Sequence, residues 1–202
     1  MIDRVEVDYH SVRLDLLQNL PVLDVGAGPS FVFSKYFALR GHRVVAMDPD
    51  PSNTNPDILG VTYLRLALVG RNPGVRAFSM DPNPQARFVS PPANEVCTPP
   101  LKDPVMVEGV TILHVSEMVQ VPVWDLVKLN CEGEESEILK SWPGPIARQI
   151  VVSFHEHYRP IGEDAIEKIM EHLDQWYLRE RHVRDARYGG GMNYWDTLLV
   201  RR

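Results

Sequence analysis

Short apolar runs alternate along the chain with segments whose apolar residues recur at helical spacing. Each apolar run is bounded by polar or turn-forming residues and has the length of a strand buried on both faces. These runs lie at residues 21–25, 43–48, 61–69, 123–130 and 149–158. Helical spacing is found at residues 30–40, 134–142 and 162–178, and residues 192–202 alternate with no helix after them. This order predicts a parallel sheet with helices on both faces, closed by an antiparallel strand.

The region around the first predicted strand carries signals for two helices. Ser30 is the expected N-cap of the helix at 30–40, and Gly41 is expected to end it. Part of residues 8–19 is expected to form an amphipathic helix, because four apolar residues recur on one side: Val12, Leu16, Leu17 and Leu20.

Residues 72–104 differ from the rest of the chain, because they contain eight of its seventeen prolines. Prolines at this density exclude long helices and central strands. We expect a short hairpin around residues 74–80, followed by an irregular insertion. Such an insertion is a candidate lid or binding loop, and a passive surface loop is the alternative. With no internal repeat and no linker, residues 1–202 are expected to form a single domain.

Composition narrows the class of protein. A chain of 202 residues suits one sizeable core. The formal net charge of −6 argues against a general nucleic-acid binder, which would carry a basic patch. No apolar stretch approaches the ~20 residues of a membrane span, and the charged N-terminus does not suit a signal peptide. Cys97 and Cys131 give neither a disulfide framework nor metal-ligand spacing, so a reducing cytoplasmic compartment is expected.

Polar residues and glycines gather where the predicted strands end. In a doubly wound sheet, the carboxyl ends of the strands meet at one edge, and ligands bind beyond that edge. The candidates found in this way are Asp24, Gly26, Gly28, Asp48, Ala67, Asn130, Glu132, His155, Glu156 and His157.

The loop in VLDVGAGPSF, residues 22–31, indicates the kind of ligand. A dinucleotide fingerprint has a third glycine where this chain has Phe31, and a P-loop would need Gly-Lys-Ser/Thr. Asp24, just before the glycines, suits a cationic amino group better than a pyrophosphate; a loop-capping acid is the alternative. Asp48 lies about twenty residues past the loop, where a carboxylate can accept both ribose hydroxyls. The pattern favours S-adenosylmethionine over a dinucleotide.

Five segments of the chain resemble the FkbM family of S-adenosylmethionine-dependent methyltransferases. They are VLDVGAGPS, VVAMDPDP, LALVG, WDLVKLNCEGEESEILKSW and VVSFHEHY. The most distinctive is DLVKLNCEGEESEILKSW, in which Asn130 stands where the family usually has Asp. The resemblance covers roughly residues 20–158. It implies a three-layer, doubly wound, Rossmann-like class I methyltransferase fold, an α/β fold with a seven-stranded sheet whose last strand is antiparallel.

That fold implies a place for each half of the cofactor. The adenosine half would lie against Ala67 and Leu68, and the methionine end over the glycine loop with Asp24 near its amine. The expected cofactor-binding residues are Asp24, Gly26, Ala27, Gly28, Ser30, Asp48, Pro49, Ala67, Leu68 and Asn130.

The sulfonium methyl group would point toward three expected catalytic residues, Asn130, Glu132 and His155. Transfer to a hydroxyl needs a general base, and His155 is the first candidate because an imidazole titrates near neutral pH. Glu132 could orient the histidine or the acceptor. The alternatives are a structural histidine at a strand end, and a carboxylate placed favourably at a helix N-terminus. Asn130 keeps hydrogen-bonding capacity but cannot act as a base.

A metal site is a further alternative, with His155, Glu156, His157 and Asn130 as its ligands. Two histidines and an amide are a thin shell for a hard cation that prefers oxygen ligands, so we expect no metal.

The expected function is therefore S-adenosylmethionine-dependent O-methyl transfer to a hydroxyl of a sugar or glycan, the acceptor class coming from the resemblance. The alternatives are methylation of a non-sugar small molecule, an inactive module that still binds the cofactor, and a nucleotide-binding domain of a larger assembly. The expected partner is a small-molecule or glycan acceptor, with glycan-building enzymes as the expected context, and neither nucleic acid nor a membrane span.

Overall fold

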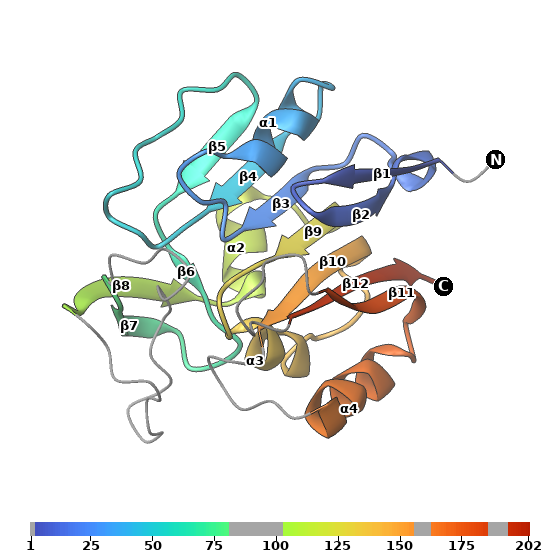
Figure 1. The fold of residues 1–202 in the computed structure, drawn as a ribbon. Helices are drawn as coiled ribbons and strands as arrows, with labels where there is room; N and C mark the ends of the chain where they lie inside the picture. The colour runs from blue at the N-terminus through green and yellow to red at the C-terminus, as the bar shows by residue number, and fades with distance from the viewer. Residues whose placement is uncertain (1–2, 81–102, 156–162, 186–193) are drawn as a thin grey trace.

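A seven-stranded sheet forms the centre of the protein, whose computed structural model describes residues 3–80, 103–155, 163–185 and 194–202 (Figure 1). The strand order is β11-β12-β10-β9-β3-β4-β5. The bounds of these strands, in the same order, are Tyr177–Asp185, Tyr194–Arg201, Ala147–His155, Trp124–Leu129, Val22–Val25, Val44–Met47 and Val61–Leu64.

Within the described ranges, β12 is the strand of this sheet that runs against the others. It pairs antiparallel with both β10 and β11, whereas β3, β4, β5, β9 and β10 pair in parallel. The sheet confirms the predicted seven strands and the predicted antiparallel closing strand. The predicted strands at 21–25, 43–48, 123–130 and 149–158 correspond to β3, β4, β9 and β10.

Alternating side chains of the strands build a core on each face of the sheet. On one face, Leu23 and Leu129 pack with Ile138 and Ile169, which come from the helices α3 and α4. On the other face, Val22 packs with apolar residues of α1 and of the N-terminal strands. The helices are α1 (Val32–Ala38), α2 (Ile112–Val119), α3 (Glu135–Lys140) and α4 (Glu163–Leu173). This arrangement gives the predicted three layers. No helix in the described part of the chain combines the length and the apolar character that a membrane span needs.

The predicted helix within residues 8–19 is wrong. The structure has a hairpin of β1 (Arg4–Val7) and β2 (His10–Arg13), followed by a short 3-10 helix at Leu14–Leu16. Asp8 and Tyr9 form the turn with φ values of 49° and 68°, the left-handed conformation that a two-residue hairpin turn requires. The buried side chains of β2 alternate at period two, at His10 and Val12, and this periodicity prevails over the helical spacing of the leucines.

The apolar run at 61–69 is divided between two sheets. It leaves the central sheet after β5 through a tight turn, in which the backbone N–H of Leu66 donates to the carbonyl of Leu64 (2.9 Å). Residues Ala67–Leu68 then form β6 of a second, three-stranded sheet of order β6-β8-β7. The prediction that this run is one strand is therefore corrected.

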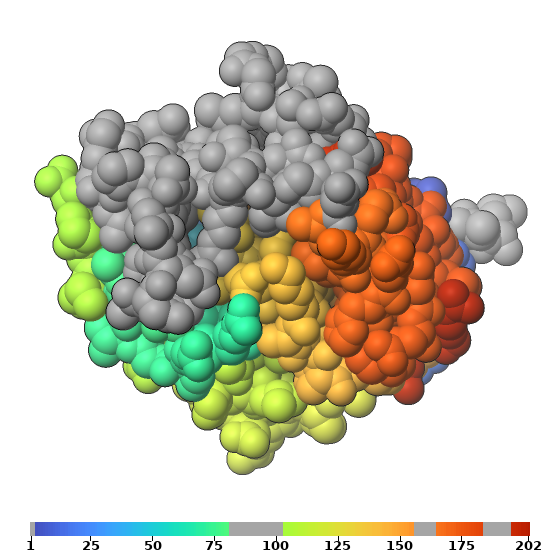
Figure 2. Space-filling view, turned by 90° about the horizontal axis from the view of Figure 1, so that it is seen from below, coloured from blue at the N-terminus to red at the C-terminus, as the bar shows by residue number. Residues whose placement is uncertain are grey.

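The second sheet also corrects the hairpin predicted around residues 74–80. Strand β7 (Gly74–Phe78) pairs antiparallel with β8 (Val105–Val110), with Phe78 opposite Val105. Its partner strand thus lies beyond the proline-rich segment, most of which, residues 81–102, lies outside the described residues. Figure 2 shows α3 on the surface between the second sheet and α4.

Candidate functional site

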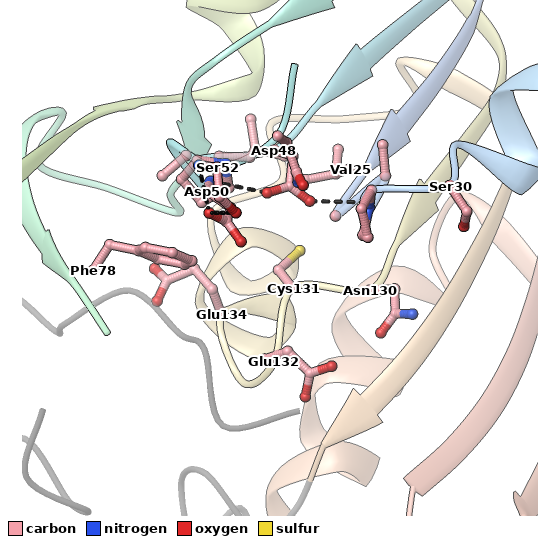
Figure 3. Close-up of a pocket in the computed structure, with 18 of the residues that line it drawn as sticks. Val25, Ser30, Asp48, Asp50, Ser52, Phe78, Asn130, Cys131, Glu132 and Glu134 are labelled. Carbon is pink, nitrogen blue, oxygen red and sulfur yellow. Dashed lines mark hydrogen bonds between the residues drawn. The ribbon is translucent and has the colours of Figure 1, made fainter. Parts of the chain in front are cut away.

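A cavity of about 490 Å³ lies at the carboxyl ends of β3, β4 and β9, the edge predicted from the strand ends. Its volume is in the range of small-molecule sites. We call it the strand-end cavity, and Figure 3 shows Asp48 facing the loop of Asn130–Glu132 across it. The lining residues are Asp8, Val25, Gly26, Ala27, Gly28, Pro29, Ser30, Asp48, Pro49, Asp50, Ser52, Asn53, Ala67, Leu68, Phe78, Asn130, Cys131, Glu132 and Glu134.

The glycine loop brings its backbone to the surface of the cavity. Gly26 has a φ of +71°, and a Cβ there would lie 1.8 Å from the carbonyl oxygen of Asn130, so no side chain fits. Gly28 also has a positive φ, and the space beside it is open. The backbone can therefore approach a ligand closely at this loop.

The Asp48 carboxylate, which directly follows β4, is hydrogen-bonded to the glycine loop that follows β3. Its Oδ2 accepts a hydrogen bond from the backbone N–H of Gly28 (2.9 Å), and its Oδ1 accepts one from Asp50 (2.9 Å). Burial raises the pKa of Asp48, and these two backbone N–H groups oppose that rise. Because each carboxylate oxygen has two lone pairs, both oxygens can still accept a hydrogen bond from a hydroxyl group of a ligand.

Asp24 has a different partner from the predicted one. Its side chain is fully buried, its Oδ1 lies 3.0 Å from Nζ of Lys128, and its Oδ2 accepts from Ser34 Oγ (2.6 Å). Lys128 also donates to the carbonyl of Gly26 (2.7 Å). Burial lowers the pKa of Lys128, but nearby carboxylates outweigh that effect and keep the lysine charged. The largest of these effects comes from Asp24. Asp24 does not line the cavity, so its structural role is to hold this lysine under the glycine loop.

The start of α1 also differs from the prediction. Ser30 is exposed and lines the cavity, whereas Phe31 occupies the N-cap position with a φ of 50° and no side-chain cap. The Phe31 ring is buried edge-to-face against Tyr63, with centroids 5.3 Å apart. The helix therefore begins at a packed aromatic residue and not at the predicted serine cap.

Glu132, Glu135 and His155 form a cluster beside the cavity. His155 Nδ1 lies 2.9 Å from Oε1 of Glu135, and His155 Nε2 lies 3.5 Å from Oε2 of Glu132. Glu135 is fully buried and accepts from the backbone N–H groups of Cys131 (2.7 Å) and Gly133 (2.9 Å). Glu132 lines the cavity and His155 does not. The two carboxylates therefore hold the imidazole from both sides, and one of them reaches the cavity.

The charges of this cluster differ from those that an isolated histidine and an isolated carboxylate would have. Burial lowers the pKa of His155, but Glu132 and Glu135 outweigh it and raise that pKa to about 9. Burial raises the pKa of Glu132 to about 7, although His155 opposes the rise. The raised pKa of His155 favours its imidazolium form, in which no ring nitrogen has a lone pair to take a proton. Glu132 is the group that titrates near neutral pH, and it faces the cavity.

Asn130 contributes an unsatisfied acceptor to the same cavity. Its Oδ1 is buried and has no hydrogen-bond partner among the described residues. Ala27, Pro49, Ala67 and Leu68 line the cavity, as expected for cofactor-binding residues. Glu156 and His157 lie outside the described residues. Among the residues that the structure describes, no group of three or more potential metal ligands is present.

Sequence reasoning missed several cavity residues. Five of them lie within four residues of a predicted residue and could have been found by extending each loop: Asp50, Ser52, Asn53, Cys131 and Glu134. Asp8 had no such signal, because it enters from a hairpin that was predicted as a helix.

The charge of the strand-end cavity is one-sided. Five carboxylates line it, from Asp8, Asp48, Asp50, Glu132 and Glu134. Among the described residues that line it there is no lysine, arginine or histidine. A phosphate or pyrophosphate would meet these carboxylates without a basic side chain among the described lining residues to pair with it, whereas a cationic ligand would be stabilised.

Comparisons with known proteins add evidence on the fold alone. No protein-family profile and no curated protein matches this chain, so the resemblance to the FkbM family stays a prediction. Among solved structures, a Lactococcus lactis protein described as a candidate hemolysin has a TM-score of 0.50 and 12% identity, covering 93% of this chain and 80% of that chain.

Two further structures are named as methyltransferases. A TehB-like S-adenosylmethionine-dependent methyltransferase from Corynebacterium glutamicum has a TM-score of 0.48 and 11% identity, covering 92% of this chain and 82% of that chain. The 1,6-didemethyltoxoflavin-N1-methyltransferase of Burkholderia thailandensis was solved with 1,6-didemethyltoxoflavin and S-adenosylhomocysteine. It has a TM-score of 0.48 and 15% identity, covering 90% of this chain and 70% of that chain.

The strand order, the antiparallel last strand and the three layers define the fold class. It is the Rossmann-like class I methyltransferase fold, as the sequence predicted.

Proposed function

We propose that this protein is an S-adenosylmethionine-dependent methyltransferase that transfers the methyl group to a hydroxyl. The observation that carries the proposal is the charge of the strand-end cavity, in which carboxylates surround a glycine loop and no basic side chain lies among the described lining residues. S-adenosylmethionine has a sulfonium and an ammonium group, so such a cavity favours it over a dinucleotide.

The residues present fit both halves of this cofactor. Asp48 offers two carboxylate oxygens to a ribose, and Ala67 and Leu68 offer an apolar surface to an adenine. Gly26 and Gly28 let the backbone approach the methionine part closely. The buried Oδ1 of Asn130, which has no partner among the described residues, supports a hydrogen-bond donor of the ligand in this cavity.

Glu132 is the proposed general base, in place of His155. The bound cofactor would supply an electrophilic methyl carbon. Bond formation between the acceptor oxygen and that carbon would leave the electron pair of the carbon–sulfur bond on the sulfur and would release the hydroxyl proton. Glu132 takes the proton of the hydroxyl, and the His155 imidazolium 3.5 Å away stabilises the carboxylate before this step. His155 is thus a positioning residue, itself held by Glu135.

A sugar or glycan hydroxyl is the proposed acceptor. This part of the proposal rests on the resemblance of DLVKLNCEGEESEILKSW to the FkbM family. The carboxylates of the cavity are compatible with it, because carboxylates commonly accept hydrogen bonds from hydroxyl groups.

The test is a product assay. The protein is incubated with S-adenosylmethionine and a panel of mono- and oligosaccharides and non-sugar alcohols, and methylated product is detected by mass spectrometry. We expect product with a saccharide, and a rate about 10²- to 10⁴-fold lower in Glu132→Gln, the range for loss of a general base. Glu117→Gln, on the exposed face of α2, is the matched control and should keep the wild-type rate.

Each other outcome corrects a specific part of the proposal. Product only with non-sugar alcohols would replace the acceptor class. Cofactor binding without any product would favour the inactive module, and a wild-type rate in Glu132→Gln would exclude this base.

A further inference from the structure

The turn of the N-terminal hairpin places a carboxylate in the strand-end cavity. Asp8 lines the cavity, although it lies far in the sequence from the glycine loop. The β1–β2 hairpin packs beside α1 on one face of the sheet (Figure 1). The left-handed φ values of Asp8 and Tyr9 make the turn, and the pairing of Val7 with His10 fixes its position.

Asp8 differs from the other carboxylates of the cavity, because within the described residues it accepts no hydrogen bond and forms no ion pair. Asp48 accepts two backbone hydrogen bonds, and Asp50 accepts two from Ser52. Glu132 lies beside the His155 imidazolium, and Glu134 lies near the backbone N–H of Gly70. No hydrogen bond or ion pair within the described residues involves the Asp8 carboxylate. Its carboxylate can therefore bind a cation of the ligand without giving up a hydrogen bond to the described residues.

Asp8 and the glycine loop line the same cavity, and the charge of Asp8 acts on the lysine that supports this loop. The Asp8 carboxylate is one of the nearby groups that raise the pKa of the buried Lys128. Lys128 in turn donates to the carbonyl of Gly26. Because Lys128 already contacts Asp24 at 3.0 Å, the lysine charge is shared and does not neutralise the cavity.

We propose that Asp8 binds the ammonium group of the cofactor's methionine part and so carries the role that the sequence pattern assigned to Asp24. This inference rests on the proposed cofactor. The hairpin thereby becomes part of the binding site, and the buried pair of Asp24 and Lys128 supports the loop from below. Recognition of the amino-acid part would then come from a segment that precedes the first strand of the central sheet.

The test compares two ligands that share the adenosine and sulfur but differ in the amino-acid part. S-adenosylhomocysteine has the ammonium group, whereas 5′-methylthioadenosine lacks it. Their dissociation constants are measured by titration calorimetry for the wild type and for Asp8→Asn. Asparagine tolerates a left-handed φ, so the turn should persist in the variant. Glu6→Gln, an exposed residue of the same hairpin, is the matched control.

We expect Asp8→Asn to bind S-adenosylhomocysteine about 10- to 100-fold more weakly, the range of a charge-assisted hydrogen bond. Binding of 5′-methylthioadenosine should stay unchanged, and Glu6→Gln should match the wild type with both ligands.

Three results would overturn the inference. Equal weakening of both ligands would assign Asp8 a structural role, and unchanged or tighter binding of S-adenosylhomocysteine would show that Asp8 does not face the ammonium group. Binding of neither ligand by the wild type would overturn the proposed function itself, and the inference with it.

Discussion

The roles of Glu132 and His155 follow from what surrounds them rather than from their residue types. An isolated imidazole would be the better base near neutral pH, and an isolated carboxylate would be ionised and weakly basic. Here two carboxylates hold the imidazole in its charged form, and burial raises the pKa of one of them to about 7. The sequence predicted that Asn130, Glu132 and His155 would lie together at the edge of the sheet where the parallel strands end. It could not predict their charge states, because Glu135 enters only through the packing of α3.

The pH dependence of the rate tests this exchange of roles. Glu132 must be ionised to accept a proton, so the rate should rise with pH through about 7. In His155→Asn the positive charge that lowers the pKa of Glu132 is lost, so the midpoint should move to higher pH while activity persists above it. The measurement is kcat/KM from pH 5 to 9 for both proteins. A variant that is inactive at every pH, with no displaced profile, would instead make His155 the base.

Gly26 offers a residue-level test of the glycine loop. Gly26→Ala would place a Cβ 1.8 Å from the Asn130 carbonyl, so the loop must move and S-adenosylhomocysteine binding should be lost. Gly41→Ala is the matched control, because its φ is also left-handed (+87°) but its Cβ would meet no atom within 4 Å.

The left-handed backbone should cost each variant about 1–2 kcal/mol of stability, as measured by urea unfolding. Gly26→Ala should cost more than this and should alone lose the ligand. Normal ligand binding by Gly26→Ala would show that the loop is not part of the site.

At the scale of elements, local patterns identified strands buried on both faces but not strands whose partners are distant. β3, β4, β9 and β10 are nearly continuous apolar runs, and their type follows from composition alone. Strand β2 and the turn before it lie in the segment that was taken for a helix, because short segments satisfy both periods. β7 pairs with a strand beyond residues 81–102, and no local signal records that pairing. Strands β8 and β11 and helix α2 were not predicted.

Helix α2 did carry a signal at its start. Thr111 is its N-cap, and the hydroxyl of Thr111 accepts from the backbone N–H of His114. Threonine followed by an apolar-periodic segment is a recognised helix start, so this helix could have been predicted.

One buried ion pair links β3 and β9. Lys128 lies opposite Asp24 in the parallel register, and both side chains are inaccessible to solvent. Lys128→Met would leave the Asp24 carboxylate buried without its partner, which costs about 3–5 kcal/mol. The double variant Asp24→Asn/Lys128→Met removes both charges and should recover most of that loss.

Urea unfolding of the wild type, the single variant and the double variant measures both effects. A double variant less stable than Lys128→Met would contradict a charge-pairing role, and would indicate that these side chains act through other contacts.

At the scale of the whole molecule, the fold was the part most accessible from sequence. The alternation of strand and helix fixes a doubly wound sheet, and the final alternating segment without a helix fixes the antiparallel strand. The same topology brings loops that are distant in sequence to one edge, which is why the cavity was expected where it lies. The second sheet and the N-terminal hairpin are additions to this plan, and both contribute residues to the cavity, Ala67, Leu68 and Phe78 from the sheet and Asp8 from the hairpin.

The most direct test of the account is whether the strand-end cavity binds this cofactor and not a dinucleotide. The free energy of unfolding is measured by urea denaturation with S-adenosylhomocysteine, with NAD, and with neither. At a hundred times its dissociation constant, S-adenosylhomocysteine should add about 2.7 kcal/mol to the stability of the wild type. It should add less to Asp48→Ala at the same concentration, and NAD should add nothing to either protein. Stabilisation by NAD, or none by S-adenosylhomocysteine at millimolar concentration, would contradict the account.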